Sequence, residues 1–406
     1  MPRQDGLTQV APLRIAGVRL AAGAAGIRYQ GRDDLVLLAL PAGAQTAAVF
    51  TTNAFCAAPV QIARRHLAQT APRWLLINAG NANAGTGDRG LADAEMSCTA
   101  LAAAGDCAPE QVLPFSTGVI GEYLPVERIA AALPQLVTSL REDGWEAAAR
   151  AIMTTDTRPK TASARCDLGG REATVVGMAK GAGMIRPDMA TMLAFLATDA
   201  AVPRDLLASI LRDAVADTFN AISIDGDTST NDACVLCAAG TLPGAPVAKG
   251  SPAAAALGAA VHAVCDTLAT DIVSDGEGAS KLVSIEITEA QSATEARAVA
   301  DTIAHSPLVK TALFAADPNW GRILAAVGRA GVPGLDIERV RIWLDDCLIV
   351  SGGGRDPAYT ESAGRAVMAR DAFRIGVALG RGRDCARVLT CDLSYDYVRI
   401  NAEYRT

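Results

Sequence analysis

A glycine-flanked loop leads directly into an apolar run near the middle of this chain. Residues 180–193 read Lys-Gly-Ala-Gly-Met-Ile-Arg-Pro-Asp-Met-Ala-Thr-Met-Leu, and a lone threonine, Thr191, stands near the start of the apolar run. A threonine hydroxyl is a weak nucleophile unless a base lies beside it, and one solution is an N-terminal threonine whose own α-amine is the base. Small Ala190 on the acyl side suits self-cleavage by an N→O acyl shift. The pattern predicts either cleavage between Ala190 and Thr191 or a plain turn before a buried strand.

Several further runs follow one another in a fixed order along the chain. They are Gly17–Ile27, Val49–Asn53, the asparagine-rich run Asn78–Ala84, Ser116–Gly121, Asp225–Asp232, Ala316–Arg322 and Asn401–Thr406. Together with the loop before Thr191, these runs resemble the ornithine acetyltransferase family, the bifunctional glutamate N-acetyltransferases of arginine biosynthesis, from about Leu13 to Thr406. The chain departs from the family's usual residues at Asp188, where asparagine is more common, and at Gly85, where cysteine is more common.

The resemblance implies a fold and a division of the chain. The fold would be α+β, with layered mixed sheets, flanking helices and a self-cleaving core of the N-terminal-nucleophile type. Cleavage would give an alpha fragment, residues 1–190, and a beta fragment, residues 191–406, which begins with the nucleophile. We expect two copies of each fragment to assemble. The residues themselves favour the same fold class, because candidate strands and helices are mixed along the whole chain.

The resemblance also implies a reaction. Thr191 would take the acetyl group of N2-acetylornithine, release ornithine, and pass the acetyl group to glutamate in a ping-pong cycle. The family allows acetyl-CoA as a second acetyl donor. No metal or organic cofactor would be required, and the enzyme would be cytoplasmic.

The family's site residues carry over to matching positions of this sequence. Thr117 and Gly118 would form the oxyanion hole, because a hydroxyl beside a glycine N–H offers two donors to a developing negative charge; without the resemblance they suit a polar turn. The substrate-binding residues would be Thr154, Lys180, Thr191, Glu277, Asn401 and Thr406. Taken singly, these are ordinary features: a helix-capping hydroxyl, a solvated lysine, a loop acid and a chain end.

Composition restricts the possible partners. The chain has 406 residues and a net charge of −7. It has no basic run, so we expect neither nucleic acid nor an anionic membrane as a partner. No apolar signal segment follows the start, and no uninterrupted apolar stretch reaches the length of about 18 residues that a membrane span needs. The stretch that comes closest, Ala253–Val264, predicts a buried alanine-rich helix.

Other motifs suggest metal or phosphate binding but favour plain structure. Among ten cysteines, Cys234 and Cys237 have Cys-x-x-Cys spacing, yet they lie in a run, Ala233–Ala239, that predicts a buried strand. The acids of Asp225-Gly226-Asp227 lack the spacing of a calcium loop and predict a polar loop near the site. Gly352-Gly353-Gly354-Arg355 lacks the Lys-Ser/Thr of a phosphate-binding loop. The three histidines lie outside every glycine-rich motif, which favours a nucleophile that brings its own base.

Residue periodicity predicts the following elements. The strands are expected at Leu35–Leu40, Thr46–Phe50, Trp74–Asn78, Glu172–Met178, Thr191–Leu196, Val340–Ile349, Phe373–Leu379, Val388–Leu393 and Tyr395–Ile400. The helices are expected at Ala92–Ala104, Val126–Leu140, Trp145–Met153, Arg204–Phe219, Ala253–Thr270 and Ala293–Ala304.

Two other classes of function stay open. One is an N-terminal-nucleophile amidase or aminopeptidase with a similar self-cleaving core, in which water accepts the acyl group. The other is a ligand-binding relative that keeps the fold without the chemistry. An assay for acetyl transfer to glutamate distinguishes the first, and failure to cleave at Thr191 would support the second.

Overall fold

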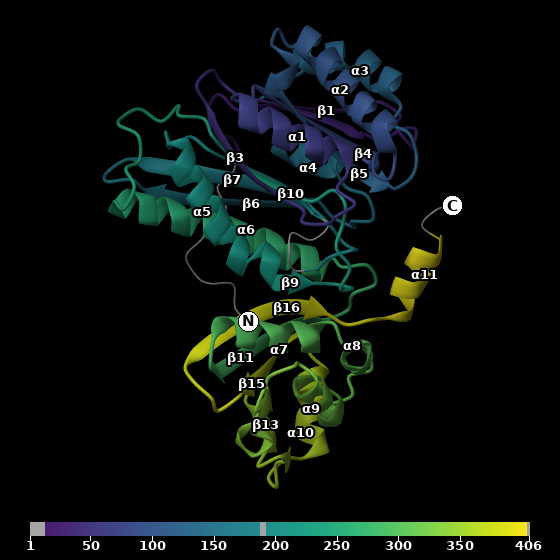
Figure 1. Ribbon diagram of the computed structural model, residues 1–406, viewed down its shortest axis with the longest axis vertical. Coiled ribbons are helices and arrows are strands. Elements are labelled where there is room, and N and C mark those ends of the chain that lie inside the picture. The colour runs from purple at the N-terminus through teal and green to yellow at the C-terminus, as the bar shows by residue number, and fades with distance from the viewer. Residues whose placement is uncertain (1–12, 187–191, 404–406) are drawn as a thin grey trace.

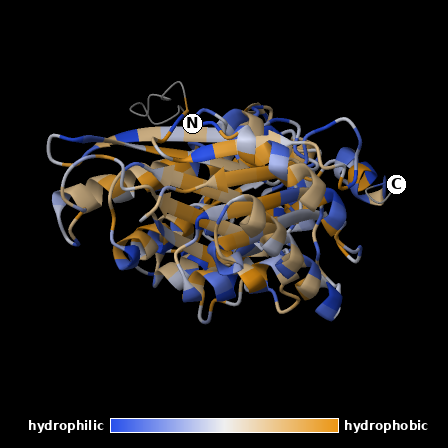
Figure 2. Cartoon of the chain, turned by 90° about the horizontal axis from the view of Figure 1, so that it is seen from above, coloured by the Kyte–Doolittle hydropathy of each residue, from blue (hydrophilic) through white to orange (hydrophobic). Residues whose placement is uncertain are grey.

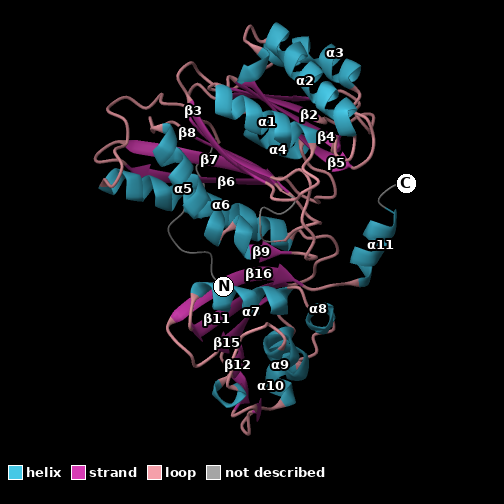
Figure 3. Cartoon of the chain, viewed as in Figure 1, coloured by secondary structure: helices cyan, strands magenta, loops and turns pink. Residues whose placement is uncertain are grey.

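The computed structural model describes residues 13–186 and 192–403. Within these residues the strands form sheets of four, five and seven strands, and helices pack against them (Figure 1, Figure 3). This architecture confirms the predicted class, α+β with layered mixed sheets. Figure 2 shows the hydrophobic segments concentrated on strands inside the molecule, as expected for sheets that are covered by other elements.

The four-stranded sheet comes from the first part of the chain. Its order is β1 (Arg19–Gly23), β2 (Leu35–Ala39), β4 (Trp74–Asn81) and β5 (Val112–Val119). Its outer face packs against α2 (Gly87–Ala104) and α3 (Val126–Thr138) through an apolar core that includes Leu101 and Leu133. Strands β4 and β5 run parallel, so their carboxyl ends lie side by side.

The five-stranded sheet contains strands from both sides of the predicted cleavage bond. Its order is β3 (Gln45–Phe50), β10 (Ala233–Ala238), β8 (Leu193–Thr198), β7 (Glu172–Lys180) and β6 (Lys160–Asp167). Every residue of β8 is buried, which suits a central strand covered on both faces.

Both faces of the five-stranded sheet are covered. One face meets the four-stranded sheet, where the rings of Phe115 and Phe195 touch edge to face with centroids 5.1 Å apart. Helices α1 (Ala58–Gln69) and α4 (Trp145–Ala151) contribute to the same core. The other face packs against α5 (Arg204–Asp217) and α6 (Pro252–Ser274).

The seven-stranded sheet comes mainly from the last part of the chain. Its order is β14 (Gly354–Arg355), β13 (Cys347–Ser351), β12 (Arg341–Leu344), β15 (Ala372–Ala378), β11 (Leu282–Ala290), β16 (Asp384–Cys391) and β9 (Ile222–Ser223). The helices packed against it are α7 (Ala293–Ala304), α8 (Pro307–Phe314), α9 (Trp320–Gly328) and α10 (Glu361–Met368). Short 3-10 turns lie at Pro109–Gln111, Phe219–Ala221 and Ile337–Arg339. Leu389 and Cys391 of β16 enter the core beneath α6, which joins this sheet to the rest of the fold.

Helix α6 is the element that most resembles a membrane span. By length and composition alone it could cross a membrane, and it is the one helix in the described part of the chain that could. In the fold it packs on β6 and β7, with Leu257, Val264 and Leu268 fully buried in the core. It is therefore the buried alanine-rich helix predicted for Ala253–Val264.

The cysteines of the Cys-x-x-Cys pair lie on β10, as the buried-strand interpretation predicts. Cys234 belongs to the core beneath α5 and α6, whereas Cys237 belongs to the core between the two sheets. The two thiols therefore face opposite sides of the sheet and do not converge on one site.

Two of the predicted strands are wrong. The stretch Val340–Ile349 is a hairpin of β12 and β13, which turns at Asp345 with φ of +47°. The stretch Tyr395–Ile400 begins a helix, α11 (Tyr395–Glu403), and Ser394 Oγ accepts a hydrogen bond from the Tyr397 N–H at 3.3 Å near its start. None of the described residues of α11 is buried, so the alternation of residue types in this segment does not reflect a buried face.

The other predicted elements agree with the structure to within a few residues at their ends. The predicted strand Thr191–Leu196 begins outside the described residues, and the described strand β8 is Leu193–Thr198. Strands β1, β6 and β11 and helix α1 are among the elements that periodicity did not predict.

Candidate active site

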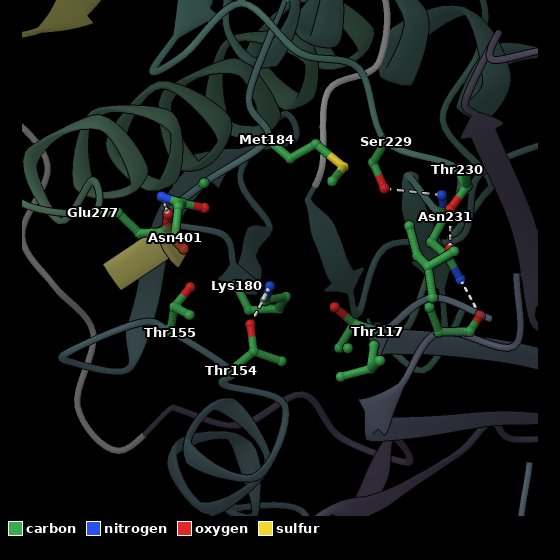
Figure 4. Close-up of a pocket in the computed structure, with 15 residues that line it drawn as sticks. Thr117, Thr154, Thr155, Lys180, Met184, Ser229, Thr230, Asn231, Glu277 and Asn401 are labelled. Atoms are coloured by element: carbon green, nitrogen blue, oxygen red, sulfur yellow. Dashed lines mark hydrogen bonds between the residues drawn. The ribbon is translucent and has the colours of Figure 1, made fainter. Parts of the chain in front are cut away.

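A cavity of about 230 Å³ lies where the carboxyl end of β5 meets the loops after α4, β7 and α6. It is lined by Thr117, Gly118, Thr154, Lys180, Glu277 and Asn401, all of them residues that the sequence assigned to the site. The other assigned residues, Ala190, Thr191 and Thr406, lie outside the described residues. Figure 4 shows Lys180 between Thr117 on one side and Glu277 with Asn401 on the other. The roles of these residues stay predictions.

The Thr117–Gly118 pair lies on β5 where its backbone approaches that of β4 closely. Gly118 has φ of +133°, and a Cβ there would lie 2.2 Å from the carbonyl carbon of Gly80 on the neighbouring strand β4. Only glycine fits this conformation and this contact. Asn231 Nδ2 donates to the carbonyl oxygens of Ala82 and Ser116 at 2.6 and 2.9 Å, which ties the ends of both strands to the loop before β10.

Lys180 is a buried cation at the end of β7. Only 3% of its surface is exposed, and its Nζ donates to Thr154 Oγ1 at 2.8 Å. Burial lowers the pKa of Lys180, while the nearby carboxylates of Asp156 and Glu277 oppose that effect. Because Lys180 pairs with Leu193, the first residue of β8 lies directly beside this lysine.

A buried network of charges beneath the cavity holds Lys180 in place. Asp156 Oδ1 accepts from Lys160 Nζ at 2.7 Å and from the Gly181 N–H at 2.7 Å, and its other oxygen lies 3.9 Å from Lys180 Nζ. Lys160 Nζ also donates to Asp275 Oδ2 at 2.6 Å. Burial alone would raise the pKa of Asp156, but the charges of Lys180 and Lys160 outweigh it and lower the value to about 2.

Sequence reasoning missed this network. Asp156 stands in the run Thr154–Thr157, which the sequence interprets as a helix end with Thr154 as a substrate contact, and Lys160 follows three residues after that run. The available signal in the sequence was that two charged residues lie close to Thr154, which matches a substrate contact of the family. Their partner Asp275 is distant in sequence, so spacing alone could not have found it.

Glu277 joins the cavity to the loop that contains the predicted cleavage bond. Its N–H donates to the Ala182 carbonyl oxygen at 2.7 Å, and its Oε2 accepts from Asn401 Nδ2 of α11 at 2.7 Å. A Cβ on Gly183 would lie 2.5 Å from the Glu277 carboxyl group. Gly183 is therefore needed for the close approach of the Glu277 carboxyl group to the loop backbone.

Asp225 holds a later part of the same loop. Its two oxygens accept the N–H groups of Met184 and Ile185 at 2.5 and 2.9 Å, and the Tyr397 hydroxyl of α11 lies 3.3 Å away. Burial raises the pKa of Asp225, and these N–H groups oppose the effect. The Asp225–Asp227 segment is thus the polar loop near the site that the sequence predicted.

Comparison with known proteins decides the family. The model of the ArgJ family matches residues 19–406. This chain belongs to the ArgJ family. The arginine biosynthesis bifunctional protein ArgJ of Methylococcus capsulatus (strain Bath) is 60% identical over 405 residues, which is 100% of this chain and 99% of that protein. The protein of the same name from Pseudomonas fluorescens (strain Pf0-1) is 52% identical over 395 residues, covering 97% of each chain.

Solved structures of similar proteins cover part of the chain. The crystal structure of ArgJ from Bacillus halodurans is 38% identical, with a TM-score of 0.48, over 50% of this chain and 95% of that chain. The ornithine acetyltransferase of Mycobacterium tuberculosis, complexed with ornithine, is 34% identical, with a TM-score of 0.38, over 45% of this chain and 98% of that chain. Membership of the ArgJ family confirms the resemblance found in the sequence.

Proposed function

We propose that this chain is an acetyltransferase of arginine biosynthesis that moves an acetyl group from N2-acetylornithine to glutamate. One observation carries the proposal: a single cavity collects the Thr117–Gly118 pair, the buried cation Lys180 and the carboxylate of Glu277 beside the start of β8. Identity of 60% with a bifunctional arginine biosynthesis protein over the whole chain supports the same activity.

The first chemical step is self-cleavage. Thr191 Oγ attacks the carbonyl carbon of Ala190, the Oγ proton passes to the departing nitrogen, and the C–N bond breaks to leave an ester. Water then hydrolyses the ester, which gives Ala190 a carboxylate and Thr191 a free α-amine and a free hydroxyl. The products are the alpha fragment, 1–190, and the beta fragment, 191–406. The contacts of Ala182, Met184 and Ile185 with Glu277 and Asp225 support this step, because they fix the backbone leading to the bond.

The second step is acetyl transfer. The α-amine of Thr191, with an ordinary pKa of about 7.7–8.0, accepts the Oγ proton as Oγ attacks the acetyl carbonyl. The Thr117 hydroxyl and the Gly118 N–H stabilise the oxyanion. Ornithine leaves with the proton, and the amine of glutamate then takes the acetyl group from the Thr191 ester. The bifunctional name of the relatives supports acetyl-CoA as a second donor, which would form the same ester.

The cavity offers groups that suit both amino acids. Lys180 can pair with an α-carboxylate, which both substrates carry, and Glu277 can pair with the side-chain ammonium of ornithine. Thr154, Asn401 and Thr406 would complete the binding site. We further propose that two alpha and two beta fragments assemble and that the enzyme works in the cytoplasm.

An intact-mass spectrum of the purified protein tests the proposal. The wild-type chain should appear as two fragments cut between Ala190 and Thr191, and Thr191→Ala should give one uncut chain without transferase activity. If Thr191→Ala is still cut at that bond, a separate protease is responsible and the mechanism is wrong. Release of free acetate without transfer to glutamate would instead indicate an amidase.

A further inference from the structure

The proposed cycle needs a place for the side-chain carboxylate of glutamate, and the candidate active-site cavity offers no second cation for it. Lys180 is the only cation among the described residues that line this cavity, and the proposed function pairs it with the α-carboxylate. The other charged residue of the lining is Glu277, which suits the side-chain ammonium of ornithine and would repel a second carboxylate. An acceptor with two carboxylates therefore requires a cation beyond this lining.

A second cavity, of about 200 Å³, lies beside the first. Thr154 and Thr155 line both cavities, so the two share a wall. Arg28 and Arg32, from the segment between β1 and β2, line the second cavity and not the first. Guanidinium groups thus lie on the far side of the residues that contact Lys180.

Arg32 is the guanidinium whose charge is left for a ligand. Arg28 Nη1 lies 3.2 Å from an oxygen of Glu122, whereas Arg32 forms no ion pair with any acid in the described part of the chain. Arg32 is partly buried, and its Cζ lies 5.6 Å from the ring centroid of Tyr29. This contact with the aromatic ring restricts the guanidinium without neutralising it.

The two acids that line the second cavity do not neutralise Arg32 either. Asp34 is buried, and its two oxygens accept the N–H groups of Ala25 and Ile27, each at 2.6 Å. Glu403, near the end of the described part of α11, is exposed, so water screens its charge. The second cavity therefore keeps a cation that can attract an anion.

Arg32 and Lys180 are held by adjacent residues of the chain. Arg32 Nη2 donates to the Met153 carbonyl oxygen at 2.5 Å, and Lys180 Nζ donates to Thr154 Oγ1 at 2.8 Å (Figure 4). Because the two acceptor oxygens belong to neighbouring residues, the two nitrogens are no more than about 11 Å apart. One glutamate, with its carboxyl carbons about 5 Å apart and a hydrogen bond at each end, can bridge two cations at this separation.

We propose that Arg32 binds the side-chain carboxylate of glutamate in the second cavity while Lys180 binds the α-carboxylate. This inference rests on the proposed function, since it concerns the acetyl acceptor of that reaction. Arg32 uses one of its five N–H groups on Met153, and the others remain to grip a carboxylate. N2-acetylornithine directs its ammonium to Glu277 instead, so the two amino acids share one α-carboxylate contact and place their side chains in different cavities.

The test compares glutamate with glutamine as acetyl acceptors, because glutamine has nearly the same shape without the second negative charge. The wild type should prefer glutamate. Arg32→Gln should lower kcat/KM for glutamate by about tenfold or more, the effect of losing a charged hydrogen bond, and leave glutamine unaffected. Arg32→Lys should retain part of the preference. The KM for N2-acetylornithine in the first half-reaction should stay as in the wild type.

Arg204→Gln is the matched control. Arg204 Nη2 also donates to a backbone carbonyl oxygen, that of Leu67 at 2.6 Å, but Arg204 lines neither cavity. Its substitution should leave the ratio of glutamate to glutamine use unchanged.

Several results would overturn the proposal. They are an equal loss with both acceptors in Arg32→Gln, a loss confined to N2-acetylornithine, and a loss seen only with acetyl-CoA as donor, which would indicate a phosphate site. If Arg32→Gln does not fold, the reduced glutamate preference expected of Arg32→Lys decides. A wild-type enzyme that transfers acetyl to neither acceptor would overturn the proposed function together with this inference. Undiminished glutamate preference in Arg32→Gln would overturn this inference alone.

Discussion

At the scale of single residues, the proposed oxyanion hole of Thr117 and Gly118 predicts that one substitution slows both self-cleavage and acetyl transfer. Both self-cleavage and acetyl transfer pass through a tetrahedral oxyanion, and the Thr117 hydroxyl would donate to it in each. Thr117→Ala should therefore slow both steps by about 10²–10³. The rates are measured by intact mass and by acetyl transfer to glutamate. Ser116→Ala is the matched control, because the Ser116 hydroxyl donates to Asn78 Oδ1 at 2.5 Å and does not line the cavity. Equal slowing of both reactions in Ser116→Ala would show that Thr117 has no special role in the site.

Asp156 predicts how stability depends on pH. Its pKa in the fold is about 2, below the value of about 3.9 in an unfolded chain, so its stabilising contribution is complete above about pH 4 and is lost as the pH falls towards 2. Asp156→Asn leaves Lys160 and Lys180 less compensated and should cost about 3–5 kcal/mol near neutral pH. Denaturant melts between pH 2 and pH 6 should show a flatter acid dependence for the variant. An unchanged slope would mean that the network does not stabilise the fold.

Glu277 predicts a difference between the two substrates. N2-acetylornithine presents a side-chain ammonium, whereas glutamate presents a second carboxylate. Glu277→Gln removes the anion but keeps a group of the same shape, so it should raise the KM for N2-acetylornithine by about tenfold or more through the loss of a charged hydrogen bond. The glutamate half-reaction is the internal control, and an equal effect on both half-reactions would contradict the proposed contact.

At the scale of elements, what the sequence could predict depended on how a segment is buried. Helix α7 was predicted with its observed bounds, because its buried face repeats with helical period and Ser292 Oγ caps it by accepting the Glu295 N–H. Helix α11 was predicted as a strand, because it has no buried face in the described residues and the alternation of its tyrosines carried no information. The cavity residues were found through the family's motifs, whereas Asp275, the partner of Lys160, depends on a contact between distant segments.

Helix α11 predicts the effect of shortening the chain. It reaches the site through Asn401, which donates to Glu277, and Tyr397, which contacts Asp225. Deleting residues 401–406 should raise the KM values for both amino acids by about tenfold, because a polar wall of the cavity is lost. Self-cleavage should continue, since the precursor's own backbone is its substrate. Val398→Ala, at an exposed position of α11, is the control. Unchanged KM values in the shortened chain would show that residues 401–406 are not part of the binding site.

At the scale of the whole molecule, the segments before and after the predicted cleavage bond share one sheet and its apolar cores. Strand β8 of the beta fragment pairs with β7 of the alpha fragment, and β10 of the beta fragment pairs with β3 of the alpha fragment. The apolar cores on both faces of this sheet also combine residues from before and after the bond, such as Val176 with Phe195 and Ala164 with Val264. The segments before and after this bond are therefore parts of one folding unit, and either segment alone would leave apolar core residues uncovered.

This arrangement predicts that cleavage changes covalent structure without separating the fragments. After cutting, the alpha and beta fragments should migrate together in size-exclusion chromatography under native conditions, because strand pairing and apolar burial outlast the loss of one peptide bond. They should separate only in denaturant, where those contacts are lost. Uncut Thr191→Ala is the control, and it should elute at the same volume as the cut wild type. Fragments that separate in native buffer would mean that the shared sheet does not hold the enzyme together. The cavity could not then persist, because its lining combines residues from before the bond, such as Thr117 and Lys180, with residues from after it, such as Glu277 and Asn401.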